Sequence, residues 1–67
     1  MKTKKDQLFD VSSIGAIYRK TLTFFAHHLE DEDGNEIGPD DLEIGKPFFV
    51  IFPSGNGFTR TSAVRVT

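Results

Sequence analysis

The clearest hydrophobic pattern in the chain lies in its C-terminal third. Residues Phe48 to Phe52 are five consecutive apolar residues, rich in aromatic and β-branched side chains. Such a run is typical of a strand that is buried on both faces. Pro53 to Gly57 consists almost entirely of turn-forming residues, and Phe58 to Ser62 then predicts a strand that returns antiparallel to the first. A last short strand is expected from Val64 to Thr67.

The pattern between Ile14 and Leu29 fits two structures. At helical spacing its apolar residues form one stripe, with Ser13 as a candidate N-cap. At strand spacing, the even-numbered apolar residues between Tyr18 and Ala26 share one face. We favour one long or bent strand, because Gly15 weakens a helix start and because the Tyr, Thr and Phe residues prefer a pleated surface. A helix remains the alternative.

Two polar segments between these regions predict changes of chain direction. Asp31 to Glu36 contains an Asp-Gly pair, and glycine adopts the positive φ that tight turns need. Gly38 to Asp41 is a second break, in which Asp40 or Asp41 is placed to cap one helical turn that ends at Leu42.

These elements predict a mostly β domain of four or five short antiparallel strands, with one short helix as an option. A small closed or sharply folded barrel would cover both faces of Phe48 to Phe52. In the alternative interpretation, Phe49 and Ile51 face a second copy of the chain, as in a homodimer, or another partner. The expected core is Phe9, Tyr18, Leu22, Phe24, Phe48, Val50, Phe52, Val64 and Val66.

Length and composition limit the protein further. A chain of 67 residues buries only about 60% of its extended surface, so each large apolar residue matters. We expect a disordered basic tail at residues 1–7 and one domain at residues 8–67. The absence of Cys excludes disulfides and thiolate-bound metals. No apolar run approaches the ~20 residues of a membrane-spanning helix, and no signal peptide is evident. We therefore expect a cytoplasmic protein without membrane contact.

Charge is distributed very unevenly along the chain. Eight acidic residues and no Lys or Arg lie between positions 30 and 43, although the net charge of the whole chain is only −2. This segment predicts an acidic surface that binds a basic protein. A solvated acidic loop without a partner is the simpler alternative. The candidate partner-binding residues are Glu30, Asp31, Glu32, Asp33, Glu36, Asp40, Asp41 and Glu43.

A calcium site is not indicated by the spacing of these acids. If Gly34 takes the glycine position of a helix–loop–helix calcium loop, Asp31 and Asp33 fit the pattern. The first and last ligand positions then fall on Leu29 and Asp40, where the motif requires Asp and Glu. We predict no metal site.

Residues suited to catalysis are few. His27 and His28 are adjacent, and on a strand they would point to opposite faces, which is unfavourable for a shared metal. Ser54 lacks the motif and the base that a nucleophilic serine requires. The glycines at 55 and 57 lack the context of a phosphate-binding loop. The sequence therefore predicts a non-enzymatic protein without a cofactor.

Nucleic-acid binding is an alternative function. Lys46 is followed by closely spaced aromatic residues up to Phe52, as in the stacking strands of proteins that bind single-stranded nucleic acids. Pro47, however, stands where those strands carry Gly, and the chain is acidic overall. The residues of this alternative face are Lys46, Phe49, Phe58 and Arg60.

The C-terminal third also resembles a known group of proteins. Gly45 to Val50 (GKPFFV) is followed, after a turn, by Arg60 to Val64 (RTSAV). This arrangement is similar to the C-terminal hairpin of short bacterial and phage-encoded SH3-like β-barrel proteins that end in Thr-Ser-x-Val. The resemblance implies an SH3-like barrel and an origin in a phage or other mobile element. It also implies an accessory protein that binds or inhibits a host protein, such as one used in defence or in nucleic-acid handling.

Overall fold

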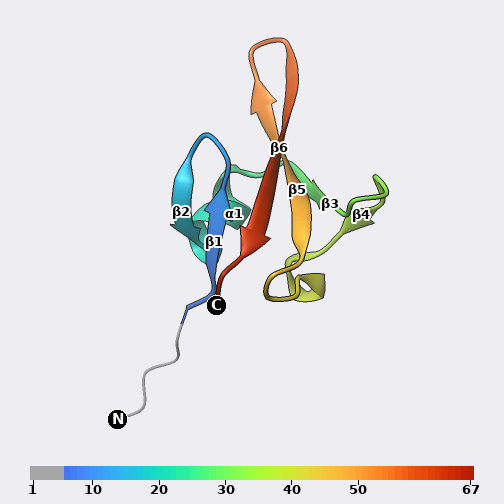
Figure 1. Ribbon diagram of the computed structural model, residues 1–67. Coiled ribbons are helices and arrows are strands. Elements are labelled where there is room, and N and C mark those ends of the chain that lie inside the picture. The colour runs from blue at the N-terminus through green and yellow to red at the C-terminus, as the bar shows by residue number, and fades with distance from the viewer. Residues whose placement is uncertain (1–5) are drawn as a thin grey trace.

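The structure is a computed structural model that describes residues 6–67, and its strands form one antiparallel sheet (Figure 1). The strand order is β2-β1-β6-β5-β3-β4. In chain order the elements are β1 (Leu8–Val11), β2 (Gly15–Tyr18), α1 (Arg19–Phe25), β3 (His28–Glu30), β4 (Glu36–Ile37), the 3₁₀ helix η1 (Pro39–Asp41), β5 (Pro47–Ser54) and β6 (Gly57–Arg65).

The expected mostly β fold with a short helix is confirmed. The sheet has six strands, so the expectation of four or five is too low. Within residues 6–67, β2 and β4 form the two edges and do not pair with each other. The sheet is therefore open, and closure into a barrel is not observed in this part of the chain.

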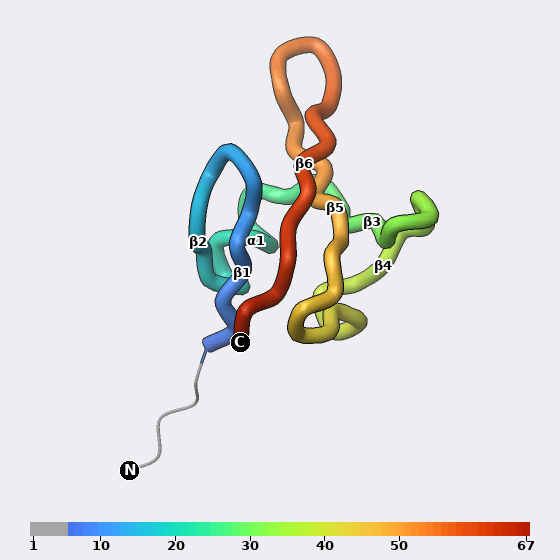
Figure 2. Tube along the Cα trace, in the orientation of Figure 1, coloured from blue at the N-terminus to red at the C-terminus, as the bar shows by residue number. Residues whose placement is uncertain are grey.

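The β5–β6 hairpin is the longest pairing in the sheet and extends beyond the other strands (Figure 2). Its register runs from Pro47 opposite Val64 to Ser54 opposite Gly57. Gly55 has a φ of 53°, as does the first central residue of a type II′ turn, whose twist matches that of the flanking strands. The expected break between strands 58–62 and 64–67 is absent, because β6 continues through residue 65 with β1 and β5 on its two sides.

The centre of the core is an edge-to-face contact between Phe9 and Phe48. Their ring centroids are 5.8 Å apart and their planes are 83° apart, a geometry worth about 0.5–1.5 kcal/mol beyond burial itself. The rings come from β1 and β5, which are separated by β6. Ala63 of β6 pairs with Val11 on one side and with Phe48 on the other, and its small side chain leaves room for the rings to meet. The other buried residues of this cluster are Leu22, Leu29, Leu42 and Val50.

The expectation of one long strand between Ile14 and Leu29 is wrong in its middle, where α1 forms. β2 ends at Tyr18, which pairs with Leu8 at the start of β1. A strand that continued past Tyr18 would have no β1 residues left to pair with, whereas a helix satisfies its backbone groups internally. Leu22 is the buried residue of α1, and it attaches the helix to the core.

Three residues of the expected core are exposed. Tyr18 is 55% exposed, Phe24 80% and Val66 47%. Strand alternation predicts that Phe24 lies in the core, but in α1 it lies away from the direction of Leu22, the buried residue of the helix. Val66 follows the end of β6. The expected core residues Phe9, Leu22, Phe48 and Val50 are buried, and Phe52 and Val64 are partly buried.

The ends of the described chain lie close together. The Thr67 hydroxyl donates to the Asp6 carbonyl (3.2 Å), and the Arg19 N–H donates to the Gln7 carbonyl (3.0 Å). Residues 1–5, most of the tail that we expected to be disordered, lie outside the described residues. No helix in residues 6–67 has the length and apolar character needed to cross a membrane.

The turn between β1 and β2 holds a residue in an unfavourable backbone conformation. Ser13, the N-cap of the helical alternative, has a φ of 77° in this turn. The left-handed region costs a residue with a Cβ about 1–2 kcal/mol. We expect Ser13→Gly to raise the free energy of unfolding by about 0.5–1 kcal/mol, measured by urea denaturation, because glycine tolerates positive φ.

Ser12→Gly is the matched control in the same turn. Ser12 lacks a positive φ, and its hydroxyl lies 2.9 Å from that of Ser62. This variant should therefore lower stability. A loss of stability in Ser13→Gly of the same size would contradict the assignment of strain to Ser13.

Candidate protein-binding surface

The eight acidic residues gather on the β3–β4 side of the sheet. They lie in β3, the turn after it, β4, η1 and the loop that follows, and we call residues 30–43 the acidic lobe. β4 is an edge strand, so the lobe forms one border of the molecule. In Figure 1, β3 and β4 lie on the opposite side of the β5–β6 hairpin from the β1–β2 hairpin. α1 reaches the lobe through the contact between Arg19 and Asp40.

Asp31 organises the turn between β3 and β4. Its Oδ1 accepts hydrogen bonds from the N–H groups of Asp33 and Asn35, each at 2.9 Å. The Gly34 N–H donates to the Asp31 carbonyl, and Gly34 has a φ of 88°. The hydrogen bond from Asn35 is the main reason that the pKa of Asp31 lies below its usual value; that from Asp33 adds to the effect, and desolvation opposes it. The predicted turn is confirmed, and Asp31 holds it.

Asp41 organises the second part of the lobe. Its Oδ2 accepts a hydrogen bond from the Gly38 N–H at 3.1 Å, and its own N–H donates to the Gly38 carbonyl at 3.0 Å. A short helical turn is present as η1, but Gly38 is its N-cap and Pro39 its first residue, so Asp40 and Asp41 lie within the turn and not at the expected cap position. Leu42 follows η1 and is buried in the core. The acidic residues of this segment are therefore attached to a fixed point of the core.

Within residues 6–67, two of the eight acidic residues form ion pairs. Glu30 contacts His28 (Nε2 to Oε2, 2.8 Å) and Arg60 (Nε to Oε1, 3.7 Å). Asp40 contacts Arg19 at 2.8 Å, in a pair whose Asp40 side chain is largely exposed, and such surface pairs contribute little stability. Within residues 6–67, no ion pair is formed by the other six: Asp31, Glu32, Asp33, Glu36, Asp41 and Glu43.

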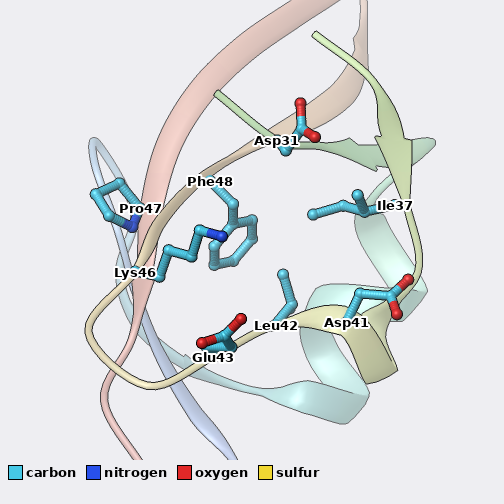
Figure 3. Close-up of a pocket in the computed structure, with 8 residues that line it drawn as sticks. All are labelled: Asp31, Ile37, Asp41, Leu42, Glu43, Lys46, Pro47 and Phe48. Carbon is cyan, nitrogen blue, oxygen red and sulfur yellow. The ribbon is translucent and has the colours of Figure 1, made fainter. Parts of the chain in front are cut away.

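A small pocket of about 100 Å³ lies between the acidic lobe and the start of β5 (Figure 3). Leu42 and Phe48 form part of its apolar lining. The Lys46 side chain extends into the pocket, whereas the carboxylates of Asp31 and Asp41 point away from its centre (Figure 3). The pocket therefore does not gather carboxylates around one point. No group of three or more metal-ligating side chains occurs in the described residues.

The alternative nucleic-acid face is only partly assembled. By strand alternation and register, Phe49, Phe58 and Arg60 share the face of the sheet that is opposite the core. Lys46 lies beside the acidic lobe instead. The guanidinium carbon of Arg60 is 3.8 Å from the centroid of the Phe49 ring. Arg60 also contacts Glu30. The cation of this face is thus engaged by a carboxylate of the same chain, and the Phe49 ring is covered.

One aromatic contact on this side was not expected from the sequence. The ring of His27 stacks on Phe58, with centroids 4.5 Å apart and planes 29° apart. The His27 N–H donates to the Ile51 carbonyl at 2.7 Å, which brings the residue beside the hairpin. No local sequence pattern signals this pairing, because it depends on the register between β3 and β5.

The proposed homodimer face, Phe49 and Ile51, is covered within the chain. Ile51 is only 7% exposed and pairs with His28 and Arg60 on its two sides. Phe49 lies beneath Arg60. An interface through these two residues would first have to displace Arg60. The homodimer stays a prediction.

Comparisons with models of protein families, with curated proteins and with solved structures find no match for this chain.

The hydrogen bonds to Asp31 predict a pH dependence of stability. Because folding lowers its pKa, the ionised carboxylate stabilises the folded state above the unfolded pKa of about 4, and this contribution is lost as the pH falls through the folded value. We expect Asp31→Asn to be less stable than wild type at pH 7. The difference should shrink between pH 5 and pH 3, as measured by urea midpoints.

Glu32→Gln is the control for this experiment, because the Glu32 carboxylate accepts no hydrogen bond within residues 6–67. It should follow the wild-type stability at each pH. A difference between Asp31→Asn and wild type that is constant with pH would show that the Asp31 charge does not hold the turn.

Proposed function

We propose that the chain is a non-enzymatic protein-binding module that contacts a basic partner protein through the acidic lobe. The observation that carries this proposal is the set of six carboxylates that lack an ion pair within residues 6–67. They lie on one border of the molecule, and five of them belong to exposed residues.

The local structure supports binding by a fixed surface. A flexible acidic loop would lose conformational entropy when a partner fixes it. Here the Asp31 turn, the Gly38–Asp41 hydrogen bonds and the buried Leu42 hold the backbone in place before any partner arrives. Carboxylates on a preorganised backbone also speed association with a basic surface, because opposite charges attract and steer the encounter.

The partner class follows from the resemblance of the C-terminal hairpin. Pro47 to Val50 of the GKPFFV segment pair with Thr61 to Val64 of the RTSAV segment in the β5–β6 hairpin. From the resemblance of these segments to short phage and bacterial proteins, we propose a phage or mobile-element accessory protein that binds or inhibits a host protein in the cytoplasm. The host surface would be basic, as is common for proteins that handle nucleic acids.

The nucleic-acid alternative receives less support from the geometry. Phosphate binding depends on free cations, and Arg60 contacts Glu30 while Arg19 contacts Asp40. Lys46 lies among the carboxylates that border the pocket. A phosphate backbone on this face would approach the acidic lobe as well.

The test neutralises carboxylates that do not hold the fold. Glu32→Gln with Asp33→Asn should weaken the complex with a partner captured from bacterial lysate by about twofold to thirtyfold at low salt, since each of the two exposed charges contributes about 0.2–1 kcal/mol. Asp6→Asn with Asp10→Asn changes the net charge equally and lies outside the lobe, so it should leave the affinity unchanged.

Affinities of the captured partner are then measured at low and high salt. Equal affinity of the wild type and the lobe variant at low salt would contradict the proposal. Salt-dependent binding of single-stranded oligonucleotides in an anisotropy titration, lost in Phe58→Ser, would instead support the alternative face.

A further inference from the structure

An open apolar groove lies along α1, and none of the residues that line it belongs to the acidic lobe. It is formed between the β1–β2 hairpin, α1 and the outer half of β5, and has a volume of about 280 Å³. Its walls are Ile14, Ile17, Thr21, Phe25 and Phe52, which expose only apolar atoms to it. Ile17 and Phe52 are partly buried and form its floor.

Large apolar side chains beside the groove remain exposed. Phe25 is 56% exposed and Phe24 80%, and their rings meet edge to face with centroids 5.0 Å apart. Ile14 is also exposed across the groove. Contiguous exposed apolar patches, unlike single exposed apolar residues, mark interaction sites. Two adjacent aromatic rings next to a recess have the character of binding hot spots.

The charge around the groove differs from that of the rest of the molecule. Residues 11–29 contain no Asp or Glu but include Arg19 and Lys20. Arg19 contacts Asp40, whereas Lys20 forms no ion pair within residues 6–67. Lys20 and Phe24 are four residues apart on α1 and so lie on the same side of the helix. The exposed cation therefore stands beside the exposed aromatic rings.

We propose that this groove binds an amphipathic helical segment of another protein, whose apolar side is bordered by Asp or Glu. Apolar side chains at helical spacing would occupy the groove and contact Phe24 and Phe25, as in helix-in-groove recognition. The acidic border would lie against Lys20. This surface is distinct from the acidic lobe and selects ligands of the opposite charge.

Other occupants fit the same features less well. A two-fold dimer through the groove would bring Lys20 of one copy near Lys20 of the other, and like charges at an interface disfavour association. A membrane surface also fits less well. Helices that lie on membranes carry a polar face rich in Lys and Arg, whereas α1 has only seven residues, and apart from Arg19 and Lys20 its polar residues are threonines.

The test is an NMR titration of the ¹⁵N-labelled chain with two synthetic peptides. Both carry Leu and Phe at positions i, i+3, i+4 and i+7, and they differ only in flanking Glu or Lys. We expect the Glu peptide to shift amide signals of residues 12–26 and Phe52, and the Lys peptide to bind about twofold to fivefold more weakly. Lys20→Glu should reverse this preference.

Variants of exposed apolar residues distinguish binding in the groove from non-specific hydrophobic binding. Phe25→Ser should lower the affinity for the Glu peptide at least about tenfold. Ile44→Ser is the control, because Ile44 is 62% exposed but lies in the loop between η1 and β5, outside the groove, and this variant should bind the peptide like the wild type. If Phe25→Ser unfolds, Phe24→Ser gives the same test, since Phe24 is the more exposed ring.

Several results would overturn the proposal. These are the absence of shifts at millimolar Glu peptide, shifts centred on residues 30–43, and equal binding of both peptides. Two further results would assign the groove to another ligand. Concentration-dependent line broadening that Phe25→Ser removes would show that the groove binds a second copy of the chain. Co-sedimentation with phosphatidylserine vesicles, without peptide binding, would show that it binds a membrane. The Glu32→Gln, Asp33→Asn variant should bind the Glu peptide normally, so failure here is distinguishable from failure of the acidic lobe.

Discussion

The fold depends on one constraint, which is that β5 carries apolar side chains on both faces. Phe48 and Val50 face the core, where Phe9 meets Phe48 edge to face. Phe49 and Ile51 face the other way, where water would otherwise reach them. The chain covers that second face with its own long polar side chains: Arg60 lies over Phe49, and Glu30 connects Arg60 to His28. An open sheet can therefore keep a strand that is apolar on both sides without closing into a barrel.

This covering layer also determines which charges are free to act. Glu30 belongs to the acidic segment by sequence, but the structure uses it to hold Arg60 and His28. Arg60 is withdrawn from the alternative nucleic-acid face by the same contact. The carboxylates that remain without an ion pair in the described chain lie farther along the lobe. Glu30 thus belongs to the residues that stabilise the sheet, and the other carboxylates of the lobe form the surface that can bind a partner.

Much of the fold could be predicted from local patterns, and the failures share a cause. The buried strand at Phe48, the Asp31 turn and the glycine turn at residue 55 depend on short-range chemistry, and each is present. The helix at residues 19–25 depends on where β1 ends, which no pattern within the helix reveals. The exposure of Phe24 follows from that helix, in which only Leu22 is buried, and the pairing of Glu30 with Arg60 depends on strand register. The composition of the acidic lobe was readable from the sequence, whereas the selection of its free carboxylates was not.

The claim that Arg60 covers the outer face of β5 is tested most directly by a double-mutant cycle between Arg60 and Phe49. The free energy of unfolding is measured by urea denaturation for the wild type, Arg60→Ala, Phe49→Leu and the double variant. A cation that lies over an aromatic ring predicts a favourable coupling of about 0.5–1 kcal/mol. Additive effects of the two substitutions, with no coupling, would show that Arg60 does not cover Phe49 and would contradict the account.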